Sequence, residues 1–283
     1  MKKTRTRADL GLCWGTVTKA TLPELIEVAG KAGFGAIATR PAMYFAAIES
    51  GMTDRELRRR LDDNGVRVTV IDPLITGLPA VPTVEEVAPD HRSFFQHGED
   101  DCFRAAEALR AETVNAVHWQ GRETSLDALA EAIGGMGGRA REHGVDIAVE
   151  FMPSSGIPDL AFTRQLIARA GSDNVGILLD TWHFVRSGGR LDELCALPPG
   201  SIAALQVSDR AAKDVRPVQA SMSGRSLPGD GEFPLSEILG IVLPANPGLN
   251  VSVEVFNEDL GRLPPLDAAK RAFAAIAKLV PER

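Results

Sequence analysis

The chain has 283 residues, of which 44% are hydrophobic and 24% charged, so it can bury a substantial core and carries no disordered-tail signature. Its formal net charge of −7 argues against a nucleic-acid partner, because nucleic-acid binding draws most of its affinity from clustered Lys and Arg. No apolar run is long enough to span a membrane, and three scattered cysteines fit reduced thiols in the cytoplasm.

Eight hydrophobic runs have the length and composition of strands, and helical patterns separate them. The predicted strands lie near residues 10–14, 35–39, 66–71, 113–118, 145–150, 175–180, 202–207 and 250–255. This alternation predicts an α/β fold, a single (β/α)8 TIM barrel over residues 1–283. A doubly wound open sheet is the alternative, but no GxGxxG follows the first strand and no Walker-type glycine loop occurs.

Helix signals occur between these runs. In residues 21–32, apolar side chains repeat at i, i+3, i+4 and i+7, and Gly33 follows as a stop. Thr53 and Glu56 have the spacing of a capping box. Residues 124–143 are also helical in pattern, although each glycine of the GGMGG at 134–138 costs roughly 1 kcal/mol relative to Ala. We expect that helix either to pack closely on the barrel or to break in two.

Two connections are long, residues 72–97 and residues 208–233. Both follow predicted strands, and in a (β/α)8 barrel the segments after the strands form the face that carries active sites. Long loops at that face commonly act as lids. We therefore expect both segments to lie over an active site and to determine the choice of substrate.

Four polar residues stand at the ends of four hydrophobic runs. They are Glu150 after VDIAV, Asp180 after VGILL, Gln206 in IAALQV and Glu254 after VSV. Alternate residues of a strand face opposite sides, and each of these shares its side with small or neutral neighbours, so we expect all four to converge on the barrel axis. Buried carboxylates need a cation or several Arg and Lys partners. The pattern predicts a metal site across the barrel mouth.

The nature of these side chains indicates which ion they would bind. Three carboxylates and one amide oxygen form a hard ligand set. We expect one divalent ion, most naturally Mn²⁺, with Mg²⁺ or Co²⁺ as alternatives and Zn²⁺ as a less natural one. Taken singly, each of the carboxylates has a plainer explanation as a salt-bridge or helix-capping residue.

Four further residues are candidates for contact with a substrate. His183 lies three positions after Asp180 and is placed to hydrogen-bond a metal ligand or to act as an acid. His118 closes the fourth strand with expected inward parity. Arg225, in the second long loop, could clamp a carboxylate or hydroxyl, and Arg40 ends the second strand. Packing, capping or loop salt bridges are the alternative roles.

The second half of the chain contains the motifs AVEFMP, GILLDTWHFVRSG, AALQVSD, RSLPGDGEF and VSVEVFN. In these motifs the chain resembles the xylose-isomerase-like TIM barrel family, which includes sugar epimerases, inosose isomerases and 3-dehydroshikimate dehydratases. The resemblance implies metal ligation by Glu150, Asp180, Gln206 and Glu254 and a substrate-side role for His183 and Arg225. Sugar epimerases usually carry a histidine at the position of Gln206, and the dehydroshikimate dehydratase branch looks more like this chain.

The expected activity is divalent-metal-dependent isomerisation or epimerisation of a small polyhydroxylated keto substrate, such as a keto-sugar or inosose. Glu150 or Glu254 would remove a proton next to the carbonyl, giving a metal-stabilised enediolate. A dehydratase is the first alternative, with His183 or a loop residue protonating a β-hydroxyl. A non-catalytic binding barrel and a multinuclear hydrolase are the others, and a homo-oligomer is left open.

Overall fold

Eight parallel strands close into a barrel, in which β1 pairs with both β2 and β8. The computed structural model describes residues 10–89, 91–119, 123–211 and 223–280. The strands are β1 (Leu10–Cys13), β2 (Ala36–Thr39), β3 (Arg67–Leu74), β4 (Thr113–Val117), β5 (Asp146–Glu150), β6 (Val175–Asp180), β7 (Ile202–Val207) and β8 (Val251–Val253). The predicted (β/α)8 barrel is confirmed, and the open sheet is excluded.

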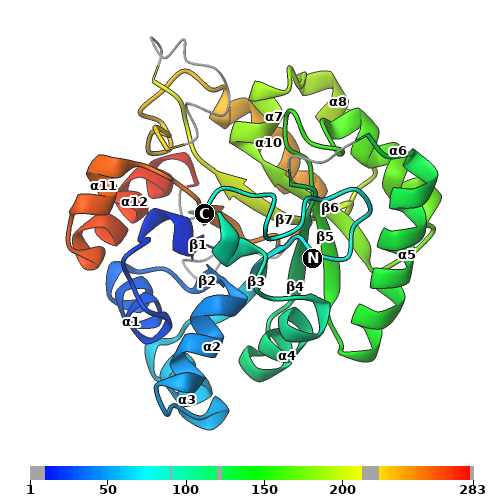
Figure 1. Cartoon of the computed structure of the whole chain (residues 1–283). Helices are drawn as coiled ribbons and strands as arrows, with labels where there is room; N and C mark the ends of the chain where they lie inside the picture. Colours follow the sequence, from blue (N-terminus) through cyan, green and yellow to red (C-terminus); the bar gives the residue numbers. More distant parts are fainter. Residues whose placement is uncertain (1–9, 90, 120–122, 212–222, 281–283) are drawn as a thin grey trace.

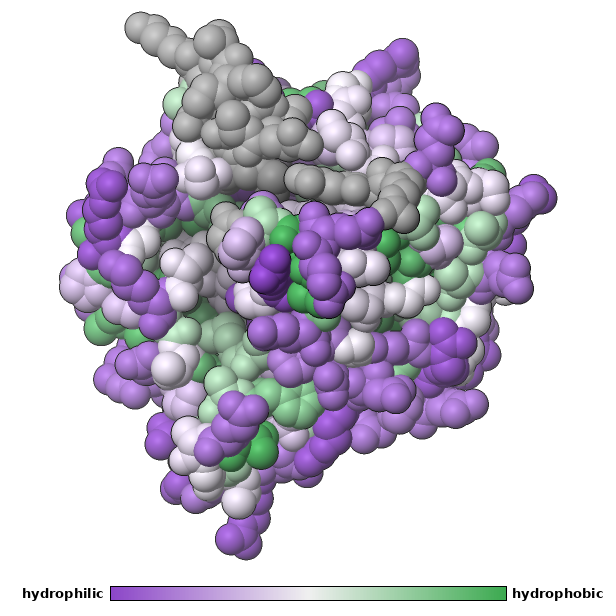
Figure 2. Space-filling model, in the orientation of Figure 1, coloured by the Kyte–Doolittle hydropathy of each residue, from purple (hydrophilic) through white to green (hydrophobic). Residues whose placement is uncertain are grey.

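Helices surround the barrel and follow one another around it in chain order (Figure 1). They are α1 (Leu22–Ala32), α2 (Pro41–Glu49), α3 (Asp54–Asn64), α4 (Glu99–Leu109), α5 (Leu126–Glu142), α6 (Leu160–Ala170), α7 (Thr181–Arg186), α8 (Leu191–Cys195), α10 (Leu235–Ala245), α11 (Glu258–Arg262) and α12 (Pro265–Leu279), with 3-10 turns η2 (Trp14–Thr16) and η3 (Arg92–Phe94). Hydrophilic side chains dominate the periphery, with smaller hydrophobic patches between them (Figure 2). Among the described helices, none combines the length and apolarity needed to cross a bilayer.

The sequence signals predicted for the helix at residues 21–32 and for the capping box of Thr53 and Glu56 are confirmed. Helix α1 ends at Gly33, whose φ of 104° is left-handed and suits a residue without a Cβ. At the start of α3, Thr53 Oγ1 accepts a hydrogen bond from the backbone N–H of Glu56 at 3.2 Å. The Glu56 carboxylate in turn accepts one from the backbone N–H of Thr53 at 2.8 Å, which completes the predicted capping box.

Strand β3 is longer than its sequence indicates. The predicted strand ends at residue 71, but β3 continues to Leu74, which pairs with Ala116 after a shift in register beyond Ile71. Asp72 therefore belongs to the strand, although the sequence places it in the first long loop. That loop shortens to residues 75–98 and contains η3. Within the second long loop, residues 212–222 lie outside the described part of the chain.

The glycine-rich segment lies inside one unbroken helix, α5, and allows it to approach α6 closely. A Cβ on Gly134 would lie 2.9 Å from the carbonyl oxygen of Ala170, and a Cβ on Gly137 would lie 2.8 Å from Ser172 Oγ. Real Cβ atoms do not tolerate such contacts with backbone, so the close-packing explanation is correct and the proposed break is wrong. Gly138 faces open space.

This difference between neighbouring glycines gives a paired prediction about stability. Gly138→Ala should raise the free energy of unfolding by about 0.5–1 kcal/mol, because alanine is the better helix former and its methyl group meets nothing. Gly134→Ala should lower it, because the methyl group would push α5 away from α6. Urea denaturation of both variants and the unaltered protein measures this. Equal effects from the two substitutions would show that close packing of α5 is unimportant.

Candidate metal centre

The four predicted ligands are buried at the carboxyl end of the barrel. Asp180 pairs with Gln206 across β6 and β7, so the two lie at the same level, and Gln206 pairs in turn with Ser252 of β8. Glu150 is the last residue of β5, and Glu254 follows β8 directly. A fourth carboxylate, Asp72 of β3, lies in the same layer. Asp72, Glu150, Asp180 and Glu254 are called the carboxylate ring below.

Arg225 provides positive charge between two members of the ring. Its Nη1 donates to Asp180 Oδ2 at 2.8 Å and to Glu254 Oε2 at 3.0 Å, and the residue is only 1% exposed. Such charge-assisted hydrogen bonds are stronger than neutral ones. Arg225 is thus the counter-ion of two predicted metal ligands, and its predicted contact with substrate stays a prediction.

The loop after β7 is tied down in a way that explains why Arg225 reaches the ring. Asp209, 1% exposed, accepts hydrogen bonds from the backbone N–H groups of Gly229, Gly231 and Phe233 at 2.9–3.1 Å. A Cβ on Gly231 would lie 2.2 Å from a backbone oxygen, so only glycine fits there. The motifs SD and PGDGEF therefore form one anchored turn, and Arg225 is held just before it.

His183 stands between Asp180 and Glu150. Helix α7 begins directly after β6, so His183 lies one turn above Asp180. Its Nε2 is 3.5 Å from Asp180 Oδ2 and 3.6 Å from Glu150 Oε1. One ligand atom from each of the three lies within 4.8 Å of the others. His183 is therefore close enough to be a ligand itself, a role that the sequence did not suggest.

Two amide side chains connect the carboxylate ring across the barrel. Gln206 Nε2 donates to Glu254 Oε1 at 2.9 Å and to Asp72 Oδ2 at 3.1 Å. Asn115 Nδ2 donates to Asp72 Oδ1 at 2.8 Å and to Glu150 Oε2 at 2.7 Å. The amide oxygens of Asn115 and Gln206 are buried without a hydrogen-bond partner among the described residues. Metal ligation by Gln206 would use that oxygen.

Three residues of this site were missed by sequence reasoning. Asn115 was a polar residue inside a buried run, VNAV, which was a usable signal. Asp72 gave no signal, because the Pro that follows it is typical of a loop as much as of a strand end. Cys13, the last residue of β1, donates through Sγ to Glu254 Oε1 at 3.1 Å, and nothing in LGLCW distinguishes it from an ordinary core cysteine.

Burial shifts the protonation of these groups strongly. It raises the pKa of Glu254 to about 8, with Arg225 opposing the rise and Asp180 and Asp72 adding to it. Burial, followed by the charges of Asp72 and Glu254, raises the pKa of Glu150 well above its ordinary value. Burial lowers the pKa of His183 to about 4, so its imidazole is neutral at pH 7.

The side chains present fit a bound cation. Glu150, Asp180 and His183 form one cluster able to hold a metal ion, and Cys13, Asp72 and Glu254 form a second. Four buried carboxylates face the single buried arginine of this site, so an added positive charge would relieve their mutual repulsion. The amide oxygen of Gln206, which has no hydrogen-bond partner among the described residues, has a lone pair that a cation would bind.

His118 lies outside the ring. One of its ring nitrogens, Nε2, is 3.0 Å from the carbonyl oxygen of Pro79, and the other, Nδ1, accepts from the backbone N–H of Gly156 at 3.0 Å. The expected inward orientation is wrong, because Asn115 faces the interior and strand alternation then turns position 118 away. His118 joins two loops of the barrel mouth, and contact with substrate would require it to release one of these hydrogen bonds.

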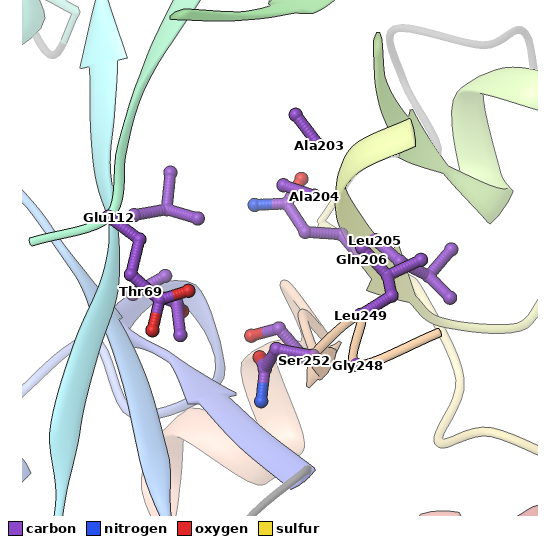
Figure 3. Close-up of a pocket in the computed structure, with 12 residues that line it drawn as sticks. Thr69, Glu112, Ala203, Ala204, Leu205, Gln206, Gly248, Leu249 and Ser252 are labelled. Atoms are coloured by element: carbon purple, nitrogen blue, oxygen red, sulfur yellow. The ribbon is translucent and has the colours of Figure 1, made fainter. Parts of the chain in front are cut away.

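A small cavity of about 60 Å³ lies below the site, at the opposite end of the barrel from the loops. Figure 3 shows Gln206 and Ala203 of β7 on one side of it and Thr69 of β3 on the other. Ser252 also lines this cavity, and its buried Oγ has no hydrogen-bond partner among the described residues. A polar cavity of this size suits ordered water rather than a substrate.

Comparison with known proteins agrees with this geometry. A family model described as a xylose isomerase-like TIM barrel matches residues 26–279. The chain belongs to this family. Inosose isomerase from Halalkalibacterium halodurans is 27% identical over 143 residues, which cover 50% of this chain and 50% of that protein. The match therefore spans half the length of this relative. The family resemblance predicted from the motifs is confirmed.

Three solved structures of the family show how widely the fold is shared. The zinc-containing structure of IolI has a TM-score of 0.81 and 18% identity, covering 99% of this chain and 98% of that one. The probable 3-DHS dehydratase AsbF of Bacillus anthracis has a TM-score of 0.74 and 17% identity, covering 95% and 98%. L-ribulose 3-epimerase has a TM-score of 0.70 and 18% identity, covering 96% and 94%. An epimerase and a probable dehydratase are thus built on the same fold.

The raised pKa of Glu254 predicts how stability depends on pH in protein freed of metal by a chelator. A carboxyl with a raised folded-state pKa stabilises the fold fully below its unfolded pKa, and this stability is lost as pH rises through the folded value, about 8. His183 acts oppositely, but only below about pH 6.5. Between pH 6.5 and 8.5 the free energy of unfolding should therefore fall, by on the order of 2 kcal/mol per such carboxyl.

Urea denaturation across this pH range measures the effect. Glu254→Gln removes the titrating group with little change of shape and should flatten the slope, whereas Asp173→Asn, at a site whose side chain is 83% exposed, should leave it unchanged. Constant or rising stability over the same range in the unaltered protein would contradict the prediction.

Proposed function

We propose that this chain is a divalent-metal-dependent isomerase or epimerase acting on a small polyhydroxylated keto substrate. The observation that carries the proposal is the pair Glu150 and Glu254, two buried carboxyls with raised pKa values that lie on different sides of the barrel mouth. Burial favours the protonated form of both carboxyls, so each can take up a proton from carbon and hold it. The relatives with isomerase and epimerase names support this reaction class.

The chain's own residues account for the movement of the proton. A divalent ion, when bound, would polarise the substrate's carbonyl oxygen as a Lewis acid. Glu150 or Glu254 then removes the proton from the adjacent carbon. If the other carboxyl, protonated beforehand, gives its proton to the opposite face, the product is an epimer and the two carboxyls have exchanged protonation states. If the first carboxyl gives its proton to the neighbouring carbon while the hydroxyl proton moves to the former carbonyl oxygen, the product is an isomer. Arg225, which contacts Glu254, helps to keep that carboxyl oriented.

We assign the ion to Glu150, Asp180, Gln206 and Glu254, with Mn²⁺ as the preferred metal. Carboxylate and amide oxygens favour such a hard ion. His183 adds a nitrogen donor within reach of Glu150 and Asp180, and imidazole also suits Zn²⁺, the metal in the IolI structure. Elemental analysis of the purified protein compares the retention of Mn²⁺ and Zn²⁺ directly.

A dehydratase is the second candidate, and one observation bears on how it would work. Burial lowers the pKa of His183 to about 4, so its imidazole is neutral at pH 7 and lacks the acidic proton of an imidazolium. The sequence-based choice of His183 as the acid for a leaving hydroxyl is therefore less suitable. The fold shared with AsbF is compatible with this chemistry.

The metal assignment predicts one ion per chain. Elemental analysis after equilibration with Mn²⁺, Mg²⁺, Co²⁺ and Zn²⁺ in turn should find a molar ratio near one, with the tightest retention for Mn²⁺. Glu150→Gln and Asp180→Asn should each weaken binding by about 10-fold or more, because an ionised ligand is lost. Asp173→Asn is the matched control. Two or more ions per chain would favour a hydrolase, and no retained ion would end the proposal.

The proton-transfer step predicts exchange with solvent. In D₂O, a panel of keto-sugars, inososes and 3-dehydroshikimate should include at least one compound whose proton next to the carbonyl is replaced by deuterium, as seen by NMR. Glu150→Gln or Glu254→Gln should slow this exchange by about 100-fold or more, the usual effect of removing a general base. Exchange shows which proton is labile even without net conversion.

Each result of the exchange experiment separates two candidates. Exchange followed by an epimer or isomer supports the proposal, and loss of water from the same compound identifies a dehydratase. A compound that binds tightly but exchanges no proton would indicate a binding barrel without catalysis. Exchange that survives in both Gln variants would show that neither carboxyl is the base.

A further inference from the structure

A second arginine at the barrel mouth lies against two aromatic rings. Arg40 follows β2, and its guanidinium carbon lies 4.2 Å from the centre of the Phe94 ring and 4.9 Å from that of Trp14. Its Nη2 donates to Ser93 Oγ at 3.1 Å. The two ring contacts and the hydrogen bond to Ser93 hold the guanidinium in place, so the positions of its other N–H groups are restricted as well.

Those other N–H groups are available. Nε and Nη1 of Arg40 form no hydrogen bond with any residue in the described ranges, and the side chain is half-buried rather than sealed. Arg225 differs, because its Nη1 is committed to Asp180 and Glu254 and the residue is fully buried. Of these two cations at the mouth, Arg40 is the one with donors to offer an incoming molecule.

Arg40 belongs to the same site as the carboxylate ring. The Trp14 ring that it covers also packs edge-on against Phe256, at 5.4 Å between centres, and Phe256 lies 5.2 Å from the guanidinium carbon of Arg225. Asp72 is near enough for its charge to oppose the effect of burial on the pKa of Arg40. A continuous aromatic wall of Phe94, Trp14 and Phe256 thus joins Arg40 to the metal centre.

We propose that Arg40 binds a carboxylate of the substrate, so that the substrate is a small keto acid rather than a neutral sugar or inosose. This deepens the proposed function and rests on it. Two N–H groups of one planar guanidinium match the two oxygens of a carboxylate. A phosphate dianion fits less well, because it needs several donors and would be repelled by the excess of carboxylates below.

Among the substrates considered above, 3-dehydroshikimate is the one that carries a carboxylate. With that group on Arg40, the rest of the molecule extends along the aromatic wall toward the ring of Glu150 and Glu254, where the proton is removed. A neutral keto-sugar has no carboxylate to accept hydrogen bonds from the N–H groups of Arg40. Arg40 would therefore determine specificity, while the carboxylate ring performs the chemistry.

The test measures binding, so it does not depend on turnover. Shikimate and quinate lack the ketone but keep the carboxylate, and their methyl esters are neutral analogues of almost the same shape. Titration of Mn²⁺-loaded protein by calorimetry should show each acid binding about tenfold or more tightly than its ester. Arg40→Met keeps an uncharged side chain against the rings and should remove this difference, weakening the acids about tenfold or more and the esters little.

Further variants separate recognition from packing. Arg40→Lys keeps the charge but loses the paired N–H groups and should recover only part of the preference for the acid. Arg59→Met removes an exposed charge on α3 and should change nothing. Thermal unfolding and metal content of every variant show that the barrel and its ion are intact.

Several outcomes would overturn the proposal. They are equal loss of acid and ester affinity in Arg40→Met, failure of both acids to bind the unaltered protein, and Arg40-dependent binding of glycerol 3-phosphate in place of the acids. Failure here combined with deuterium exchange on a neutral keto-sugar would leave the proposed isomerase standing. Acid binding without exchange on any compound would support Arg40 and overturn the proposed catalysis.

Discussion

The burial of four carboxylates at one end of the barrel is the constraint on which the rest of the site depends. Asp72, Glu150, Asp180 and Glu254 are each at most 8% exposed, and carboxylates at such depth either bind protons or attract positive charge. The protein supplies part of that charge through Arg225 and part of the hydrogen bonding through the amides of Asn115 and Gln206. What remains is a site with raised pKa values that favours a divalent ion.

The barrel and its loops share the work of building this site. The strands supply the carboxylates at fixed levels, because their register is locked by backbone hydrogen bonds around a closed ring. The anchored turn of Asp209 brings Arg225 back over the mouth, and the first long loop places Phe94 beside Arg40. The buried carboxylates therefore come from the strands, and the arginine and aromatic groups around them come from segments that follow the strands.

The electrostatics also separate the roles of the two arginines. Arg225 is surrounded by Asp180 and Glu254 and neutralises them, so its charge is largely cancelled within the protein. Arg40 is held mainly by aromatic rings, which support a cation without neutralising it. Asp72 offsets part of the charge of Arg40, but among the described residues Arg40 forms no ion pair, so of these two arginines it offers an incoming anion the larger net positive charge. The same residue type thus neutralises buried carboxylates in one place and, in the role proposed for Arg40, recognises the substrate in the other.

The sequence by itself determined the barrel, the order of its elements and the position of the predicted ligands, because strand alternation and helical periodicity are local properties that single runs display. It did not reveal Asp72, Asn115 or Cys13, whose importance depends on which distant strands become neighbours. It also mistook the side that His118 faces, because that side follows from the inward orientation of Asn115, which the sequence did not reveal. Only the tertiary structure decided that Arg225 lies against the carboxylates and Arg40 against two rings, because those contacts join residues from separate segments of the chain.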